Sequence, residues 1–486
     1  MKKSIAERTI TSATWNMIAS LAGVIVLFVR SVMLSRMLPV ATFGVYNFAS
    51  AIAALAAIVL NFGLTGAFLH RSPETEDEDN AAATHFTLIT LLAVGWSSMM
   101  ILGALWFTSA SIQLAIIVMT LSLALNQLAQ TPRIILIRRV EHQRLAVIQL
   151  SIALLTTLAA FSLAWQGAAL WALLITNIVS MLVSLVAFYG WKPVWRPHFR
   201  WNLPEMRYFL HFGSRTFFSS ALLIALDRID DLWTGFYLGD AALGFYSRAY
   251  TFATYPRRIL ATPINSVAFG SYAELKKERQ RLSQMFFRTA AFLLRTGFLL
   301  GGLLVLIAPE FIRLLLGEKW LPMTNIFRLM LIFTLLDPIK VTVADLFTAV
   351  GRPDLVIRTR LIQLAVLIVG LFGLGVWLGI VGVALAVDIM LVTGIALLLW
   401  MARRFIDISL RRLFLAPVVA LAAALTVAYG LPRFLNLSAS IWITVLLKAI
   451  IFFLLYLFVL LAIERKQTVF MLEKSLSLFH SYKSRR

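Results

Sequence analysis

The chain has no cysteine, few acidic residues and no long polar stretch. Without cysteine, disulfide bonds, thiol nucleophiles and cysteine-ligated metals are excluded. The six histidines are scattered and lack the spacing of a zinc-protease motif. A glycine-rich phosphate loop is also missing, so nothing indicates ATP hydrolysis. We therefore predict a protein that is not an enzyme, has no catalytic residues, and holds no metal and no cofactor.

Apolar residues dominate what is present. They make up 60% of the 486 residues, against about 45–50% in soluble proteins. Fourteen apolar stretches reach the roughly 20 residues that a helix needs to cross a bilayer. We predict an all-α polytopic membrane protein with about 14 transmembrane helices. The predicted spans are residues 11–37, 43–69, 85–107, 112–137, 145–165, 168–190, 207–237, 243–269, 286–307, 322–350, 358–377, 380–402, 413–431 and 440–463.

The net charge of +21 is distributed unevenly between these spans. In a soluble protein such an excess suggests nucleic-acid binding, but here Lys and Arg fall mainly in every second gap. With the N-terminus inside, the inner segments hold 30 Lys and Arg and the outer segments hold six. Basic residues are retained on the cytoplasmic side, next to an anionic leaflet. We therefore predict cytoplasmic N- and C-termini, membrane lipids as partners and no nucleic-acid partner.

The chain repeats itself at an offset of about 200 residues. The motif L38…F43-G44-V45-Y46…A49 is echoed by L238…L243-G244-F245-Y246…A249, and two shorter matches follow in the same order. The constant order argues against chance similarity between apolar helices. Spans 1–6 therefore resemble spans 7–12 in the same orientation, which is a parallel repeat. We predict an N-lobe at 1–206, a C-lobe at 207–404, two appended helices at 405–463 and a basic cytoplasmic tail at 464–486.

Two arginines lie where span 8 should be most apolar. The middle of span 2 is apolar over residues 53–59, but the matching part of span 8 reads Tyr255-Pro256-Arg257-Arg258. Pro256 removes a backbone hydrogen bond and predicts a kink there. A charge at the bilayer centre is costly and normally faces a wet cavity. Because guanidinium is planar and always charged, we predict that Arg257 and Arg258 bind a phosphate-bearing anion.

Further charges are expected inside the bilayer, mainly in the second lobe. We interpret Arg215 and Arg295 as additional ligands of the anion. The other candidates are cavity charges or groups that couple transport to H⁺ or Na⁺; they are Asp227, Arg228, Asp230, Asp231, Asp337 and Lys340. Residues three apart on a helix can pair, as Arg228 with Asp231 and Asp337 with Lys340. Self-neutralising pairs therefore stay open as an alternative.

Several segments resemble the signature of bacterial polysaccharide flippases. They are 227–230 (DRID), 237–250 (YLGDAALGFYSRAY), Pro256, 316–322 (LGEKWLP), 351–354 (GRPD) and 34–46 (LSRML…FGVY). In these segments the chain is similar to Wzx-like proteins of the multidrug/oligosaccharidyl-lipid/polysaccharide superfamily, in particular to the colanic-acid-exporter branch. The resemblance runs from the first span to span 11. It implies two six-helix lobes around a central cavity that is typically cationic.

The resemblance also implies a function. It identifies the chain as a flippase of undecaprenyl-pyrophosphate-linked oligosaccharide in the bacterial inner membrane. The cargo would be a repeat unit of capsule, exopolysaccharide or O-antigen, moved from the inner to the outer leaflet by alternating access. On this hypothesis Arg257 and Arg258 capture the pyrophosphate. The expected partners are the lipid-linked oligosaccharide, membrane lipids and other polysaccharide-assembly membrane proteins.

Two other functions remain as alternatives. A cation-coupled multidrug exporter of the same superfamily requires an acidic cavity, and the arginine pair argues against it. A membrane-embedded polysaccharide polymerase or glycosyltransferase usually carries catalytic residues on a sizeable outer loop. The largest outer segment, about 308–321, offers few such residues.

Overall fold

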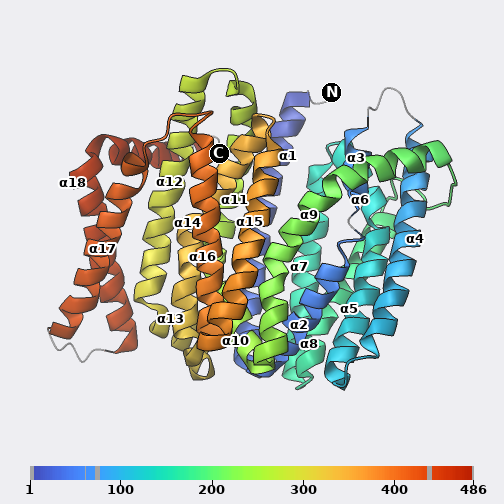
Figure 1. The fold of residues 1–486 in the computed structure, drawn as a ribbon, viewed down its shortest axis with the longest axis horizontal. Helices are drawn as coiled ribbons and strands as arrows, with labels where there is room; N and C mark the ends of the chain where they lie inside the picture. The colour runs from blue at the N-terminus through green and yellow to red at the C-terminus, as the bar shows by residue number, and fades with distance from the viewer. Residues whose placement is uncertain (1–4, 61, 72–76, 435–439, 484–486) are drawn as a thin grey trace. The chain divides into compact units, whose positions relative to one another are not determined.

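The protein is almost entirely helical (Figure 1). The computed structural model describes residues 5–60, 62–71, 77–434 and 440–483, and these form eighteen α-helices. The first nine are α1 (Ile5–Met37), α2 (Val40–Ala56), α3 (Leu64–His70), α4 (Glu78–Ala104), α5 (Ala110–Leu128), α6 (Gln130–Arg138), α7 (His142–Trp165), α8 (Ala169–Leu185) and α9 (Leu203–Leu238). The others are α10 (Asp240–Ala253), α11 (Tyr255–Leu275), α12 (Arg279–Leu306), α13 (Ala308–Leu315), α14 (Thr324–Ala349), α15 (Pro353–Gly370), α16 (Val376–Ala402), α17 (Leu410–Phe434) and α18 (Ile441–Lys483). The all-α prediction is confirmed.

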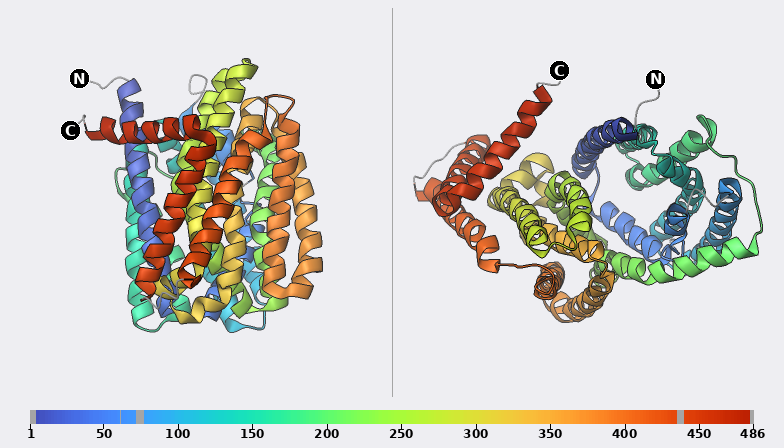
Figure 2. Two further views of the ribbon diagram at one scale, coloured as in Figure 1. Left: turned by 90° about the vertical axis from the view of Figure 1, so that its left-hand side faces the viewer. Right: turned by 90° about the horizontal axis from the view of Figure 1, so that it is seen from above.

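The chain divides into two compact units, Met1–Arg248 and Ala249–Arg486. Within each unit many helices are seen end-on in the right-hand view of Figure 2, so their axes are roughly parallel. α9 was expected to open the C-lobe, but it packs on α2, α3 and α4 of the N-terminal unit. The lobe boundary at residues 206 and 207 rests on the internal repeat and stays a prediction.

Two glycines permit a close helix crossing in the N-terminal unit. A Cβ atom on Gly44 of α2 would collide with the carbonyl of Asp240, and one on Gly244 of α10 would collide with the carbonyl of Val40. The contacting positions are therefore related by a shift of 200 residues in both directions, as at a two-fold interface. The repeated sequence motif is explained by this packing contact.

Polar residues of the same motif attach α10 to its neighbours. Asn47 Nδ2 donates to Ser247 Oγ at 2.9 Å, again across 200 residues. The hydroxyl of Tyr246 donates to the carboxylate of Asp230 on α9. These hydrogen bonds satisfy polar side chains in a region where an unpaired polar group is costly. The family-like segment 237–250 is thus largely a packing motif.

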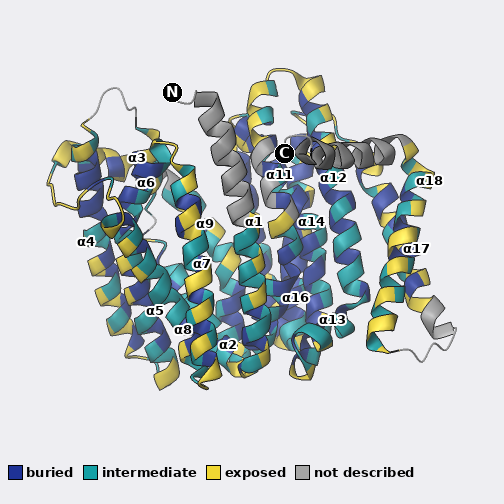
Figure 3. Cartoon of the chain, turned by 180° about the vertical axis from the view of Figure 1, so that it is seen from behind, coloured by how far each residue is buried: buried dark blue, intermediate teal, exposed yellow. Residues whose placement is uncertain are grey.

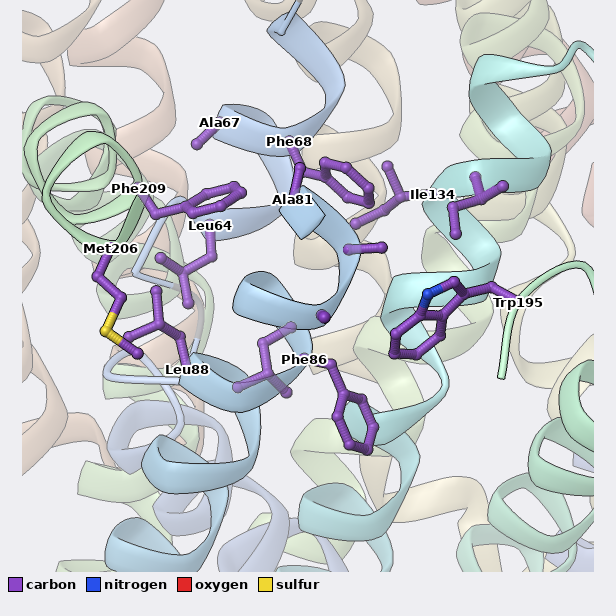
Figure 4. Packing of buried hydrophobic residues seen from close by; sticks show 14 residues of the cluster. Leu64, Ala67, Phe68, Ala81, Phe86, Leu88, Ile134, Trp195, Met206 and Phe209 are labelled. Carbon is purple, nitrogen blue, oxygen red and sulfur yellow. The ribbon is translucent and has the colours of Figure 1, made fainter. Parts of the chain in front are cut away.

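A hydrophobic cluster holds α3, α4 and α6 against the start of α9 (Figure 4). Phe68 and Phe209 are fully buried at its centre, and Trp195 contributes from the irregular segment that precedes α9. The indole Nε1 of Trp195 donates to Asp79 Oδ1 at 2.8 Å. The non-helical connection between α8 and α9 is thereby fastened to the N-terminal end of α4.

The helix is interrupted next to Pro256, where a kink was predicted. α10 ends at Ala253 and α11 begins at Tyr255, so Pro256 lies in the first turn of a new helix. A proline is tolerated there because the first turn needs no N–H donor. The hydroxyl of Thr334 donates to the carbonyl of Ala253, which would otherwise be an open acceptor at the end of α10.

Two other family-like segments form turns. Gly317 and Gly351 have φ values of 100° and 84°, which favour glycine over residues with a side chain. After the first turn Trp320 is fully buried. After the second, Arg352 donates to Asp354 at 2.9 and 3.0 Å and holds the pKa of that carboxyl below its usual range.

The centre of the C-terminal unit is α14, which is buried along much of its length (Figure 3). The appended pair α17 and α18 packs on α12. Two ion pairs fasten α18: Glu464 binds Arg295 of α12, and Lys448 Nζ lies 2.5 Å from Glu310 Oε1 of α13. These acids compensate the basic residues that the sequence places inside spans 9 and 14.

Eight helical stretches of the described chain are long and apolar enough to cross a bilayer, or nine if a bent pair in α9 counts as one span. One of the eight, Pro353–Ala402, would be about 75 Å long as a straight helix, and it is interrupted at Gly379 (φ 59°). The charged helix α14 is not among the eight, and α2 and α10 are short. The chain is therefore a multi-pass membrane protein.

The glycine crossing can be tested by adding one methyl group. We expect Gly44→Ala to destabilise the protein by about 1–3 kcal/mol, because its Cβ meets a backbone carbonyl that no rotamer change can move. The matched control is Gly95→Ala in α4, where no atom lies within 4 Å of the added Cβ. Thermal unfolding in detergent should show a lower midpoint for the first variant only, and equal midpoints would contradict the packing argument.

Candidate functional site

A cationic cluster lies where α11 meets α14 in the C-terminal unit. Arg257 donates from a terminal guanidinium nitrogen to Asp337 Oδ2 at 2.5 Å. Lys340 Nζ lies 2.7 Å from the other carboxylate oxygen of Asp337. The ring of Phe333 packs beneath both cations, with its centroid 5.6 Å from Arg257 Cζ and 5.2 Å from Lys340 Nζ. One buried carboxylate thus holds two cations above one aromatic face.

The burial of Asp337 explains why the pairing forms. Its side chain is fully buried, whereas Arg257 and Lys340 are 31% and 26% exposed. A buried carboxylate is unfavourable unless it is paired, and Pro256 begins the helix turn that brings Arg257 to it. The two cations can therefore lie inside a membrane protein with their outer surfaces accessible.

Arg258 is the next residue along α11 and carries a third cation. Its side chain is exposed and stacks over Tyr255, with 5.7 Å between Cζ and the ring centroid. In the part of the chain that the structure describes, no carboxylate lies within ion-pair distance of Arg258. The cationic cluster, defined as Arg257, Arg258, Lys340 and Asp337, therefore has an excess of two positive charges. Such an excess favours a ligand with two negative charges.

The acidic segment of α9 divides between two environments. Asp227 and Arg228 line a cavity of about 370 Å³ within the N-terminal unit. Asp230 is buried and accepts from Tyr246, and Asp231 is paired with Arg228 at 3.4 Å. The alternative of local pairing is found for Arg228 with Asp231 and for Lys340 with Asp337.

The rest of this cavity wall is neutral. α2 contributes small residues, and two amides reach it from other helices, Gln127 of α5 and Asn177 of α8. Asn177 Nδ2 donates to the hydroxyl of Tyr46 at 3.2 Å. We name this hollow the amide cavity; its lining is Ser50, Ala53, Ala54, Ala57, Leu60, Met119, Leu123, Gln127, Asn177, Ile224, Asp227 and Arg228. It combines hydrogen-bonding groups with apolar surface.

The other two predicted anion ligands are Arg215 and Arg295. The side chain of Arg215 lies outside the described residues. Arg295 is 4% exposed and is bound by Glu464, so its charge is compensated at the contact between α12 and α18. Glu464 was read as the start of the tail, and the pair joins residues 169 positions apart. No local sequence signal identifies such a partner.

The described residues contain no group of three or more His, Asp or Glu side chains that could hold a metal ion. The site chemistry that remains is electrostatic binding at the cationic cluster and neutral hydrogen bonding in the amide cavity. Neither the cationic cluster nor the described lining of the amide cavity contains a nucleophile paired with a general base.

Comparison with known proteins identifies the family. Residues 33–325 match the family described as polysaccharide biosynthesis protein. The chain belongs to this family. The prediction of a transporter and not an enzyme is confirmed.

Curated relatives match along most of their length. The chain is 25% identical to the lipopolysaccharide biosynthesis protein WzxC of Escherichia coli (strain K12), over 79% of this chain and 78% of WzxC. It is 24% identical to the teichuronic acid biosynthesis protein TuaB of Bacillus subtilis (strain 168), over 72% of this chain and 73% of TuaB. These values show a broad family relationship and no single branch of it.

Solved structures share the fold. The lipid II flippase MurJ, in an inward closed conformation, superposes with a TM-score of 0.74 at 14% identity and covers 94% of this chain and 99% of its own. A multidrug resistance transporter of the MATE family, facing inward, superposes with a TM-score of 0.60 at 15% identity, over 81% of this chain and 98% of its own. The chain therefore shares its fold with these two transporters.

The role of Asp337 can be tested by removing its charge. We expect Asp337→Asn to destabilise the protein by about 3 kcal/mol or more, because two partly buried cations lose their compensating carboxylate. The matched control is Glu318→Gln, which removes the carboxylate of the exposed pair with Arg313 and should leave the unfolding midpoint unchanged. If both variants unfolded at the wild-type temperature, Asp337 would not be the anchor of the cluster.

Proposed function

We propose that this protein is a flippase for undecaprenyl-pyrophosphate-linked oligosaccharide. The cargo is a repeat unit of capsule, exopolysaccharide or O-antigen, carried from the inner to the outer leaflet of the bacterial inner membrane by alternating access. WzxC and TuaB are named for lipopolysaccharide and teichuronic acid biosynthesis, and MurJ for lipid II flipping, which supports this class of cargo. Within the family, we propose the colanic-acid-exporter branch on the segments that resemble it.

The observation that carries the proposal is the uncompensated charge of the cationic cluster. A pyrophosphate diester has roughly two negative charges at neutral pH, and the cluster has two positive charges in excess. Arginine binds phosphate oxygens through a planar fork of donors. Arg258, exposed and without a carboxylate among the described residues, is the primary ligand; Arg257 and Lys340 support it.

The direction of transport agrees with the membrane potential. Moving an anion out of a negative cytoplasm is favoured by about 2.3 kcal/mol per charge per 100 mV. Two charges therefore supply about 4–5 kcal/mol per 100 mV before any ion coupling. Asp227, Asp230 and Asp231 are the groups that we assign to H⁺ or Na⁺ coupling on the return step.

We also propose the finer topology: fourteen spans, a parallel repeat of two six-helix lobes, two appended helices, and both termini in the cytoplasm. The reciprocal contacts of Gly44 and Gly244 support the repeat. Exposed tryptophans support the predicted positions of the membrane–water interfaces, because tryptophan is enriched at the level of the lipid headgroups. Trp106 and Trp165 are 91% and 76% exposed at predicted outer ends, and Trp201 is 67% exposed at a predicted inner end.

Because the sequence contains no cysteine, single cysteines can be introduced to test this topology directly. An impermeant maleimide should label Trp106→Cys in intact cells, since that position is exposed and predicted to be outside. It should label Phe199→Cys, which is 69% exposed and predicted to be inside, only after permeabilisation. Ala67→Cys, at a fully buried position, is the control and should stay unlabelled in both. Labelling of Phe199→Cys in intact cells would show that the orientation is the reverse of the one proposed.

Arg258 provides the test of function. We expect Arg258→Gln to lower export of the polysaccharide at least tenfold, because a charge-assisted hydrogen bond contributes about 1.5–3 kcal/mol. The lipid-linked oligosaccharide should accumulate in the inner leaflet, as measured by its accessibility to an impermeant glycan-oxidising probe on vesicles of both orientations.

The control for this experiment is Arg313→Gln, which removes an exposed arginine that pairs with Glu318 far from the cluster in sequence. It should export normally. Normal export by Arg258→Gln at wild-type protein levels would refute the anion site. Loss of export with cargo found in the outer leaflet would instead indicate a later step, such as polymerisation.

A further inference from the structure

The amide cavity of the N-terminal unit has a chemistry that differs from that of the cationic cluster. We propose that it is a carbohydrate subsite, which binds the sugar part of the lipid-linked cargo and sets which sugar is accepted. This inference rests on the proposed function. It assigns binding residues, Gln127, Asn177 and Asp227, that pyrophosphate capture does not use.

The size of the cavity suits a small ligand. Its volume of about 370 Å³ lies at the lower end of the roughly 300–1,000 Å³ typical of small-molecule sites. One wall is formed by Ser50, Ala53 and Ala54 of α2, whose short side chains leave the space open. Room for one or two sugar rings is therefore built into the bundle.

The polar groups of the lining match sugar hydroxyls. An amide both donates and accepts, as does a hydroxyl group. In the described part of the chain the side chain of Gln127 makes no hydrogen bond, so all its donors and acceptors are available. Asn177 uses its nitrogen on Tyr46 at 3.2 Å, which fixes the amide and leaves its oxygen to accept. Asp227 contributes a carboxylate to the same lining.

The charge balance argues against a second pyrophosphate site here. Arg228 is the one cation among the described residues of the lining, and it is paired with Asp231 at 3.4 Å. Together with Asp227, this leaves the cavity without excess positive charge. An anion would therefore gain little electrostatic binding energy in this cavity, whereas the amides can bind a neutral ligand rich in hydroxyl groups.

Apolar side chains complete the fit. Met119, Leu123 and Ile224 line the same hollow. Sugar rings present apolar C–H faces as well as hydroxyl edges, and small-molecule sites combine apolar walls with a few placed polar groups. The combination distinguishes this cavity from a site for a hydrated ion.

The test compares two lipids on the purified full chain in nanodiscs. The probes are the undecaprenyl-pyrophosphate-linked repeat unit extracted from the producing bacterium and undecaprenyl pyrophosphate without sugar. We expect the double variant Q127L/N177L to lower affinity for the glycosylated lipid about tenfold, the effect of losing two or three hydrogen bonds. Affinity for the bare lipid should stay within about twofold. Q166L removes an exposed amide at the end of α7 and is the matched control.

The outcomes separate the inference from the proposed function. If R258Q weakens both lipids while Q127L/N177L weakens neither, the pyrophosphate site stands and the carbohydrate subsite is refuted. If R258Q weakens neither lipid, the proposed function itself fails. Equal loss of both lipids in Q127L/N177L would also refute a sugar-specific role.

A milder variant covers the case in which the double variant does not fold. Y46F removes the hydroxyl that Asn177 engages and changes no charge; it should weaken only the glycosylated lipid, by about two- to fivefold. Q127N, which keeps the amide, should retain more affinity than Q127L. Two results together would overturn the inference in favour of a cation-binding cavity. The protein would bind tetraphenylphosphonium and lose this binding in D227N, and Y46F would show no selective loss of affinity for the glycosylated lipid.

Discussion

A charge placed inside a lipid bilayer must be compensated by an opposite charge or by water, and the architecture of the C-terminal unit depends on this constraint. Asp337 is fully buried and holds Arg257 and Lys340 on its two oxygens. The break at Pro256 supplies the turn that brings Arg257 to it. Once Arg258 is included, three cations share one carboxylate, and we propose that the two remaining positive charges make the cluster a binding site for an anion.

The same constraint explains how the other charged helices are arranged. Arg295 of α12 is compensated by Glu464 of α18, and Lys448 of α18 by Glu310 of α13, so α18 and its neighbours neutralise each other's deep cations. Arg228 is compensated by Asp231 in the N-terminal unit. The cationic cluster thus has an excess of positive charge, whereas the described lining of the amide cavity has none. A cargo with an anionic head and neutral sugars needs this division of chemistry.

Local spacing predicted a good part of this arrangement. The break at Pro256 and the pairs Arg228–Asp231 and Lys340–Asp337 follow from proline chemistry and from positions three apart on a helix. The pair Arg257–Asp337 joins residues 80 positions apart, and the meeting of Gln127 with Asn177 depends on how α5 and α8 pack. Neither has a periodic signal. A hydropathy criterion for membrane spans misses α14 because its charged residues lower the average hydropathy.

The central claim is that a pyrophosphate docks on the exposed guanidinium of Arg258, beside Arg257 and Lys340. The most direct measurement is an experimental structure of the full chain in nanodiscs with undecaprenyl pyrophosphate bound. The account predicts phosphate density within hydrogen-bonding distance of Arg258 and one of its two neighbours. Phosphate density elsewhere, with Arg258 directed into the acyl chains, would contradict it.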